Sequence, residues 1–120
     1  MIRILIVDDD RATSTLLRTL FEIEGYEGVV CPRPDEVLQT AERERPDLIL
    51  MDVHLAEVDS IGILKTIRTW PALKETPVIM MSGLDVEDKC LKAGATAFVL
   101  KPFRPAELLA EIKRNVKTEK

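Results

Sequence analysis

Residues 2–10 near the start of the chain, Ile2-Arg3-Ile4-Leu5-Ile6-Val7-Asp8-Asp9-Asp10, are the strongest indication of its fold class. The first six of these residues form a short run that is rich in β-branched side chains and nearly all apolar. Such a run is typical of a strand buried on both faces of a parallel sheet. The apolar run stops at three aspartates. Two later runs, residues 48–51 and 78–81, are fully apolar in the same way. The three runs predict the central strands of one sheet.

Segments with helical periodicity separate these runs. Leu16, Leu17, Leu20 and Phe21 recur at helical spacing, and Gly25 follows at the place of a helix C-cap. Five strand–helix units in 120 residues predict an α/β fold, a doubly wound parallel sheet with helices on both faces. Further strands are expected at 27–31 and 97–100, and further helices after Pro34, from an N-cap at Ser60, over 85–92 closed by Gly94, and around 108–116.

Composition limits the class of protein. The chain has 120 residues, 46% of them hydrophobic, and a net charge of −4 from 17 basic and 21 acidic side chains. We expect a single domain over 1–120, with its core in 2–116 and a short tail at 117–120. The acidic balance disfavours non-specific nucleic-acid binding, and no run is long enough to span a membrane. Cys31 and Cys90 lack metal-ligand spacing and are expected to be buried neutral thiols of a cytoplasmic protein.

Polar residues follow four of the predicted strands. Asp8 and Asp9 follow the first, Asp52 the third, Ser82 the fourth and Lys101 the last. Ligands of doubly wound sheets bind beyond the carboxyl ends of the strands, so these side chains are expected to meet there. Crowded carboxylates need a cation, and oxygen ligands suit Mg²⁺. With a hydroxyl and an ammonium beside them they predict a phosphoryl-transfer site.

Each of these polar residues, taken alone, could also have a purely structural role. An aspartate after a strand is often a helix N-cap, which is our prediction for Asp10. Trp70 beside Pro71 is expected to cover the end of a helix, with a partner contact as the alternative. Asp52 is the best candidate nucleophile at the predicted site, because a carboxylate can form an acyl phosphate.

Taken together, the residues that end the strands resemble those of the receiver domain of two-component response regulators. The resemblance runs from Ile4 to about Val116 and is strongest at 6–10, 46–52, 93–95 and 98–103. It implies a flavodoxin-like (βα)5 sandwich whose five-stranded parallel sheet has the order 2-1-3-4-5. It also implies a phospho-accepting signalling domain that catalyses only its own phosphorylation and dephosphorylation, and turns over no external substrate.

The resemblance assigns roles around the phosphoryl group. Asp52 would accept it from a histidine kinase or a histidine phosphotransfer protein. Ser82 would hydrogen-bond to it, Lys101 would form an ion pair with it, and the Lys101–Pro102 peptide bond would be cis. Phe98 would be the switch aromatic that turns inward with Ser82. The signal would reach an output domain or target protein through the face of the fourth helix, last strand and last helix.

The resemblance also implies the cofactor, Mg²⁺, and its ligands. Asp9 would bind the ion directly and Asp8 largely through water, and Asp52 would be a further ligand. The backbone carbonyl of His54 would complete the protein ligands. His54 follows the acceptor by two residues, a position that varies in the family and tunes dephosphorylation.

Two features depart from the family pattern. Family members usually carry Met-Pro or Leu-Pro and then Asp-Gly after the acceptor, whereas this chain has Leu55-Ala56 and Asp59-Ser60. The loop thereby loses a rigid proline and a permissive glycine. The stretch from Ser82 to Lys101 is about three residues short, close to one helical turn. We expect the missing turn to come from the fourth helix or the loop before it, which would alter the output face.

Two other functions compete with the receiver interpretation. A small Mg²⁺-dependent phosphohydrolase could use Asp52 as nucleophile, but such enzymes usually have a second acid where His54 stands, and a lid for which the chain has no room. A phosphorylation-independent interaction module could retain the fold alone. Nucleotide binding is disfavoured because both glycine-rich phosphate-loop motifs are absent from the sequence.

Overall fold

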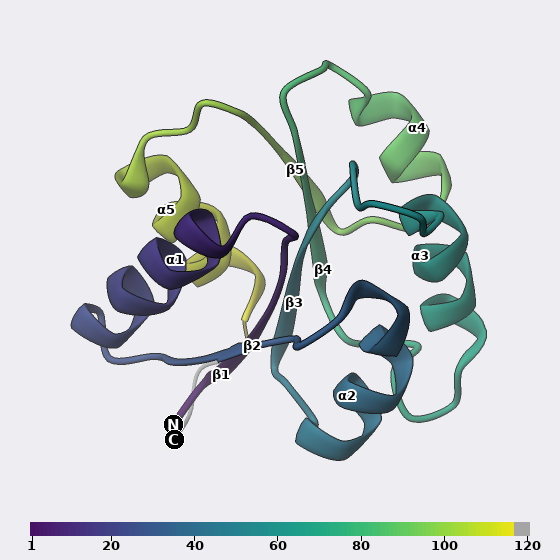
Figure 1. Ribbon diagram of the computed structural model, residues 1–120, viewed down its shortest axis with the longest axis horizontal. Coiled ribbons are helices and arrows are strands. Elements are labelled where there is room, and N and C mark those ends of the chain that lie inside the picture. The colour runs from purple at the N-terminus through teal and green to yellow at the C-terminus, as the bar shows by residue number, and fades with distance from the viewer. Residues whose placement is uncertain (117–120) are drawn as a thin grey trace.

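A single five-stranded parallel sheet organises the molecule (Figure 1). The computed structural model describes residues 1–116, so the tail predicted at 117–120 lies outside the described residues. The strand order is β2-β1-β3-β4-β5, which confirms the predicted fold class and order. The strands are β1 (Arg3–Val7), β2 (Glu27–Val30), β3 (Leu48–Asp52), β4 (Val78–Ser82) and β5 (Ala97–Leu100).

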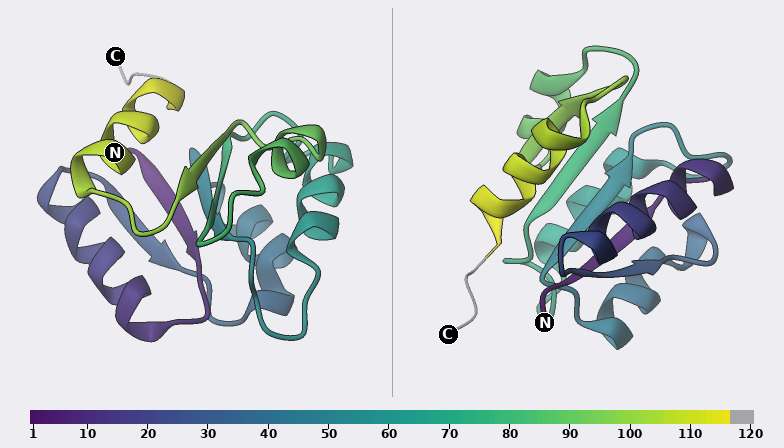
Figure 2. Two further views of the ribbon diagram at one scale, coloured as in Figure 1. Left: turned by 90° about the horizontal axis from the view of Figure 1, so that it is seen from above. Right: turned by 90° about the vertical axis from the view of Figure 1, so that its left-hand side faces the viewer.

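Helices cover both faces of the sheet, as Figures 1 and 2 show. Two pack on one face, α1 (Arg11–Ile23) and α5 (Pro105–Asn115). Three pack on the other, α2 (Val37–Glu44), α3 (Ser60–Thr69) and α4 (Glu87–Lys92), and a short 3₁₀ turn (Pro34–Glu36) precedes α2. Successive strand residues point to opposite faces, so each apolar run supplies two separate cores. This is why the central strands read as continuous apolar runs.

Aspartate side chains cap the N-terminal ends of α1 and α3, and one of these caps differs from the prediction. Asp10 caps α1 as expected, accepting the backbone N–H of Ala12. Ser60 was predicted to cap α3, and this is wrong: Asp59 is the N-cap and accepts the Gly62 N–H at 3.0 Å. The Ser60 hydroxyl instead donates to the Val53 carbonyl, so it is already engaged inside the loop.

Other local predictions are confirmed. Gly25 follows α1 with φ +88°, a left-handed conformation that suits glycine. Cys31 and Cys90 are buried, and burial raises the pKa of both thiols. Trp70 stands at the C-terminal end of α3, where its indole N–H donates to Glu42 of α2. No helix of the described residues combines the length and apolarity needed to cross a membrane.

The segment between Ser82 and Lys101 contains α4, and the origin of the missing turn stays a prediction. This helix has six residues, Glu87–Lys92, and begins two residues later than the sequence pattern predicts. Gly94 ends it with φ +112°, a conformation that disfavours any side chain. The chain then runs directly into β5.

Arg68 of α3 ties the end of this segment to its surroundings. Its guanidinium donates to the carbonyls of Gly94 and Thr76 at 2.7 Å each, and to the hydroxyl of Thr96 at 3.2 Å. Thr96 in turn accepts the N–H of Val78, the first residue of β4. Burial lowers the pKa of Arg68, but the group stays charged at neutral pH. One side chain therefore joins α3 to the segments that lead into β4 and β5.

We expect Arg68→Met to destabilise the fold by about 2–3 kcal/mol, because charge-assisted hydrogen bonds are lost and carbonyl groups are left without their donor. Urea unfolding followed by circular dichroism would measure this. Arg43→Met is the matched control, since Arg43 is exposed on α2 and pairs with its neighbour Glu44. Equal stability of the two variants would contradict a structural role for the Arg68 contacts.

Candidate functional site

Lys101 joins two acids at the carboxyl edge of the sheet. Its ammonium nitrogen lies 2.6 Å from Asp52 Oδ2 and 3.1 Å from Asp8 Oδ2. Asp52 ends β3, Asp8 directly follows β1, and Lys101 directly follows β5. Their side chains are 12%, 3% and 25% exposed. The parallel topology thus brings together three of the predicted site residues from positions far apart in sequence.

The charges of these groups depend on one another. Burial raises the pKa of Asp8, although hydrogen bonds from the Asp10 N–H and from Lys101 offset part of this effect. Burial also opposes the charge of Lys101, but the two carboxylates outweigh it and raise the pKa of the ammonium group. Lys101 is therefore a fixed positive charge beside the proposed acceptor oxygen.

His54 links Ser82 to Asp52. The strands β3 and β4 are neighbours, and Ser82 ends β4 completely buried. The His54 ring nitrogen Nε2 lies 3.0 Å from Ser82 Oγ, and the His54 backbone N–H donates to Asp52 Oδ1 at 2.8 Å. The Leu84 N–H also donates to Ser82 Oγ, at 2.9 Å. Sequence reasoning did not foresee the ring contact, which joins residues 28 positions apart.

The predicted metal ligands are brought to the same edge but are not assembled around a common point. Asp9 accepts the backbone N–H of Ala56, whereas Asp8 and Asp52 face Lys101. Over residues 1–116, no group of three acidic, histidine or cysteine side chains is arranged to hold a metal ion. The donor chemistry nevertheless fits Mg²⁺, because all three acids offer hard carboxylate oxygens. The role of the His54 carbonyl stays a prediction.

The cis peptide bond predicted after the last strand is confirmed, whereas the switch role of Phe98 stays a prediction. The Lys101–Pro102 peptide bond is cis. Phe98, on β5, is half-buried against the core on the side of α3 and α4. Within the sheet, Phe98 pairs with Met80 and Leu100 pairs with Ser82. Phe98 and Leu100 are two residues apart on one strand, so their side chains lie on the same face of the sheet. The proposed switch aromatic is therefore the neighbour of Leu100, which pairs with Ser82.

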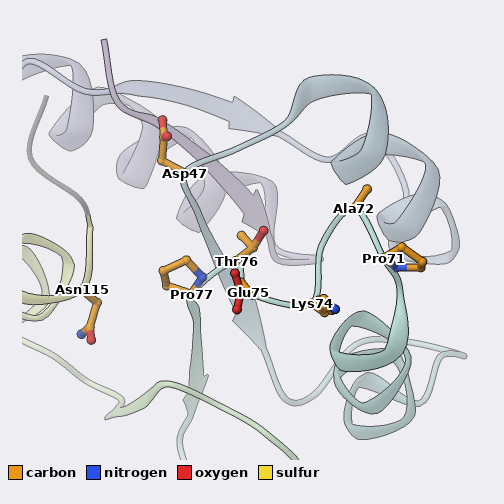
Figure 3. A pocket seen from close by; sticks show the side chains of 8 residues that line it. All are labelled: Asp47, Pro71, Ala72, Lys74, Glu75, Thr76, Pro77 and Asn115. Carbon is orange, nitrogen blue, oxygen red and sulfur yellow. The ribbon is translucent and has the colours of Figure 1, made fainter.

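A pocket of about 340 Å³ lies at the opposite edge of the sheet (Figure 3). Asp47, which precedes β3, and Pro77, which precedes β4, line it together with Asn115 at the end of α5. None of the residues predicted from the sequence to carry chemistry lines this pocket. The candidate site therefore lies at the carboxyl edge around Asp52, away from this pocket.

A family model described as the response regulator receiver domain matches residues 4–113. The chain belongs to the response regulator receiver family. Among curated relatives, the alkaline phosphatase synthesis transcriptional regulatory protein PhoP of Bacillus subtilis is 38% identical over 114 residues, which cover 92% of this chain and 47% of that protein. This receiver chain thus spans about half the length of that relative.

Solved receiver structures have the same fold. A response regulator from Chloroflexus aurantiacus superposes with a TM-score of 0.87 at 31% identity, covering 93% of this chain and 94% of that one. The receiver domain of a sensor histidine kinase from Pseudomonas aeruginosa, whose structure has a magnesium ion coordinated in the active-site cleft, gives a TM-score of 0.84 at 29% identity and covers 94% and 95%.

Proposed function

We propose that this receiver accepts a phosphoryl group on Asp52 from a phosphohistidine of a kinase or phosphotransfer protein. The observation that carries this proposal is the placement of Lys101, 2.6 Å from Asp52 Oδ2 at the carboxyl edge of the sheet. A lysine there balances the acceptor's charge before transfer and the phosphoryl charge after it. We further propose that the domain catalyses only its own phosphorylation and hydrolysis.

The transfer would proceed by attack of an Asp52 carboxylate oxygen on phosphorus. The bond between phosphorus and the donor's imidazole nitrogen breaks, and its electron pair returns to that nitrogen, which is then protonated. Lys101 would move from the carboxylate to a phosphoryl oxygen, and Ser82 would donate its hydroxyl proton to another. The His54 N–H, now 2.8 Å from Asp52 Oδ1, keeps the carboxylate oriented for attack.

Asp8, Asp9 and Asp52, with the His54 carbonyl, would hold Mg²⁺. When bound, the ion would supply charge neutralisation for the phosphoryl oxygens. Asp9 is the acid that must turn toward the site for this, since its carboxylate now accepts the Ala56 N–H.

The signal would leave through β5. Phosphorylation adds about −1.5 to −2 charge beside Ser82. Movement of Ser82 toward that charge would change the space beside Phe98, which is half-buried, and the ring would then turn further inward. The adjoining Leu100 is half-exposed on the face of α4, β5 and α5. A target protein, or an output domain in a longer chain, would bind this altered face.

Intact mass spectrometry tests the proposal directly. The protein is incubated with acetyl phosphate in the presence of Mg²⁺, and in parallel with EDTA. We expect the mass of one phosphoryl group to be added with Mg²⁺ and none with EDTA, because the acids and the incoming phosphate repel one another without a cation. Failure of transfer from both acetyl phosphate and phosphorylated histidine kinases would favour the phosphorylation-independent module.

A further inference from the structure

The loop between β3 and α3, residues 53–59, makes hydrogen bonds to three groups of the candidate site. His54 contributes two of them, through its backbone N–H to Asp52 and its ring to Ser82. Ala56 contributes the third, through its backbone N–H to Asp9 Oδ2. The loop therefore contacts the acceptor, the phosphoryl-binding hydroxyl and one of the proposed metal ligands together.

The Ala56 bond depends on the residue type at that position. Alanine has a backbone N–H to donate, and a proline there would have none. The loop is also tied at both ends, because the Ser60 hydroxyl donates to the Val53 carbonyl and Asp59 caps α3. Glu57, next to Ala56, has φ +61°, an uncommon left-handed conformation for a residue with a side chain. These contacts aim the Ala56 N–H at Asp9.

The bond determines where the Asp9 carboxylate lies. Asp9 is exposed and directed to the loop, while Asp8 and Asp52 share Lys101. Within the described part of the chain these acids do not form a three-ligand metal site. A carboxylate that turned to a cation bound between Asp8 and Asp52 would move away from the amide. The two partners thus require different positions of one side chain.

We propose that the Ala56 N–H competes with Mg²⁺ for the Asp9 carboxylate, so that metal binding releases the Ala56 part of the β3–α3 loop while His54 stays at the site. Ala56 is in this sense a positioning residue, acting through Asp9. The inference rests on the proposed function, because it takes Asp9 as a magnesium ligand. A hydrogen bond to a charged group is worth about tenfold in an equilibrium constant, which sets the size of the expected effect.

Substitutions of Ala56 test the contribution of its backbone N–H separately from the other contacts of the loop. Ala56→Pro removes the donor, and Ala56→Gly keeps it as the matched control. We expect Ala56→Pro to bind Mg²⁺ about tenfold more tightly than the wild type, and Ala56→Gly to stay within about twofold of it. The affinity is measured by titrating Mg²⁺ into ¹⁵N-labelled protein and following the amide signals of Asp10 and His54, with thermal melting to check folding.

The wild-type protein provides a second measurement that does not depend on how the proline variant folds. We expect hydrogen exchange of the Ala56 amide to speed up by about tenfold on saturation with Mg²⁺, with a midpoint at the Kd of the titration. Equal or weaker Mg²⁺ affinity in a folded Ala56→Pro variant, or unchanged Ala56 exchange at saturating Mg²⁺, would overturn the inference and leave the proposed function standing. Absence of Mg²⁺ binding in every variant would overturn both.

Discussion

Asp52→Asn is expected to abolish phosphoryl incorporation from acetyl phosphate, because an amide in place of the carboxylate has no nucleophilic oxygen of comparable strength. Asparagine keeps the shape of the side chain and an oxygen that can accept the bond from Lys101 or from the His54 N–H. The fold should therefore persist. Intact mass after incubation with Mg²⁺ measures the adduct, and thermal melting shows that the protein remains folded.

The control for this variant is Asp47→Asn. Asp47 lies at the opposite edge of the sheet, where it accepts the Arg3 N–H at 2.8 Å, a bond that asparagine can also accept. We expect Asp47→Asn to incorporate one phosphoryl group like the wild type. An Asp52→Asn protein that still gains a phosphoryl group would move the acceptor to another residue, which peptide mapping would then identify.

Lys101→Met is expected to lower the free energy of unfolding by about 2–4 kcal/mol at neutral pH in EDTA, because it leaves two largely buried carboxylates without their cation. Burial already raises the pKa of Asp8, and loss of Lys101 should raise that pKa further. A carboxyl group with a higher pKa in the folded state binds more protons when folded than when unfolded, so lowering the pH stabilises the variant relative to the wild type. The deficit should therefore be smaller at pH 5 than at pH 8.

Urea unfolding at both pH values measures this deficit. Lys65→Met, an exposed lysine on α3, is the matched control and should be close to neutral. Adding Asp8→Asn to Lys101→Met should recover much of the lost stability, since it removes one of the unpaired charges. A deficit that is the same at pH 5 and pH 8, and that Asp8→Asn does not reduce, would point to lost packing of the lysine stem instead of charge.

Much of the fold could be predicted because the signals are local. Buried parallel strands are apolar on both faces, so the three central strands are visible as short continuous runs such as 48–51. The N-cap of α3 shows where local reasoning ends. Asp59 and Ser60 are both good capping residues, and the choice depends on the Val53 carbonyl, which engages the Ser60 hydroxyl across the loop.

Some features of the candidate site could likewise be predicted from the sequence and others could not. Asp52, Ser82 and Lys101 could be predicted because a parallel sheet collects its carboxyl ends at one edge. The contacts of the His54 ring and of the Ala56 N–H could not, since one depends on a side-chain rotamer and the other on the path of a loop. Arg68 was missed for a similar reason: its acceptors are mainly backbone carbonyls, which carry no sequence signal.

The Arg68 contacts bear on how the domain could transmit a signal. The guanidinium holds the residues just before β4 and just before β5 through Thr76, Gly94 and Thr96, at the amino ends of both strands. Ser82 and Lys101 lie at the far, carboxyl ends of the same two strands. With the amino ends fastened to one helix, we expect a displacement that begins at Asp52 to be largest at the carboxyl ends of β4 and β5. Arg68 would thus hold the amino ends of both strands in place while the carboxyl ends respond, so its loss should weaken the response without altering Asp52 itself.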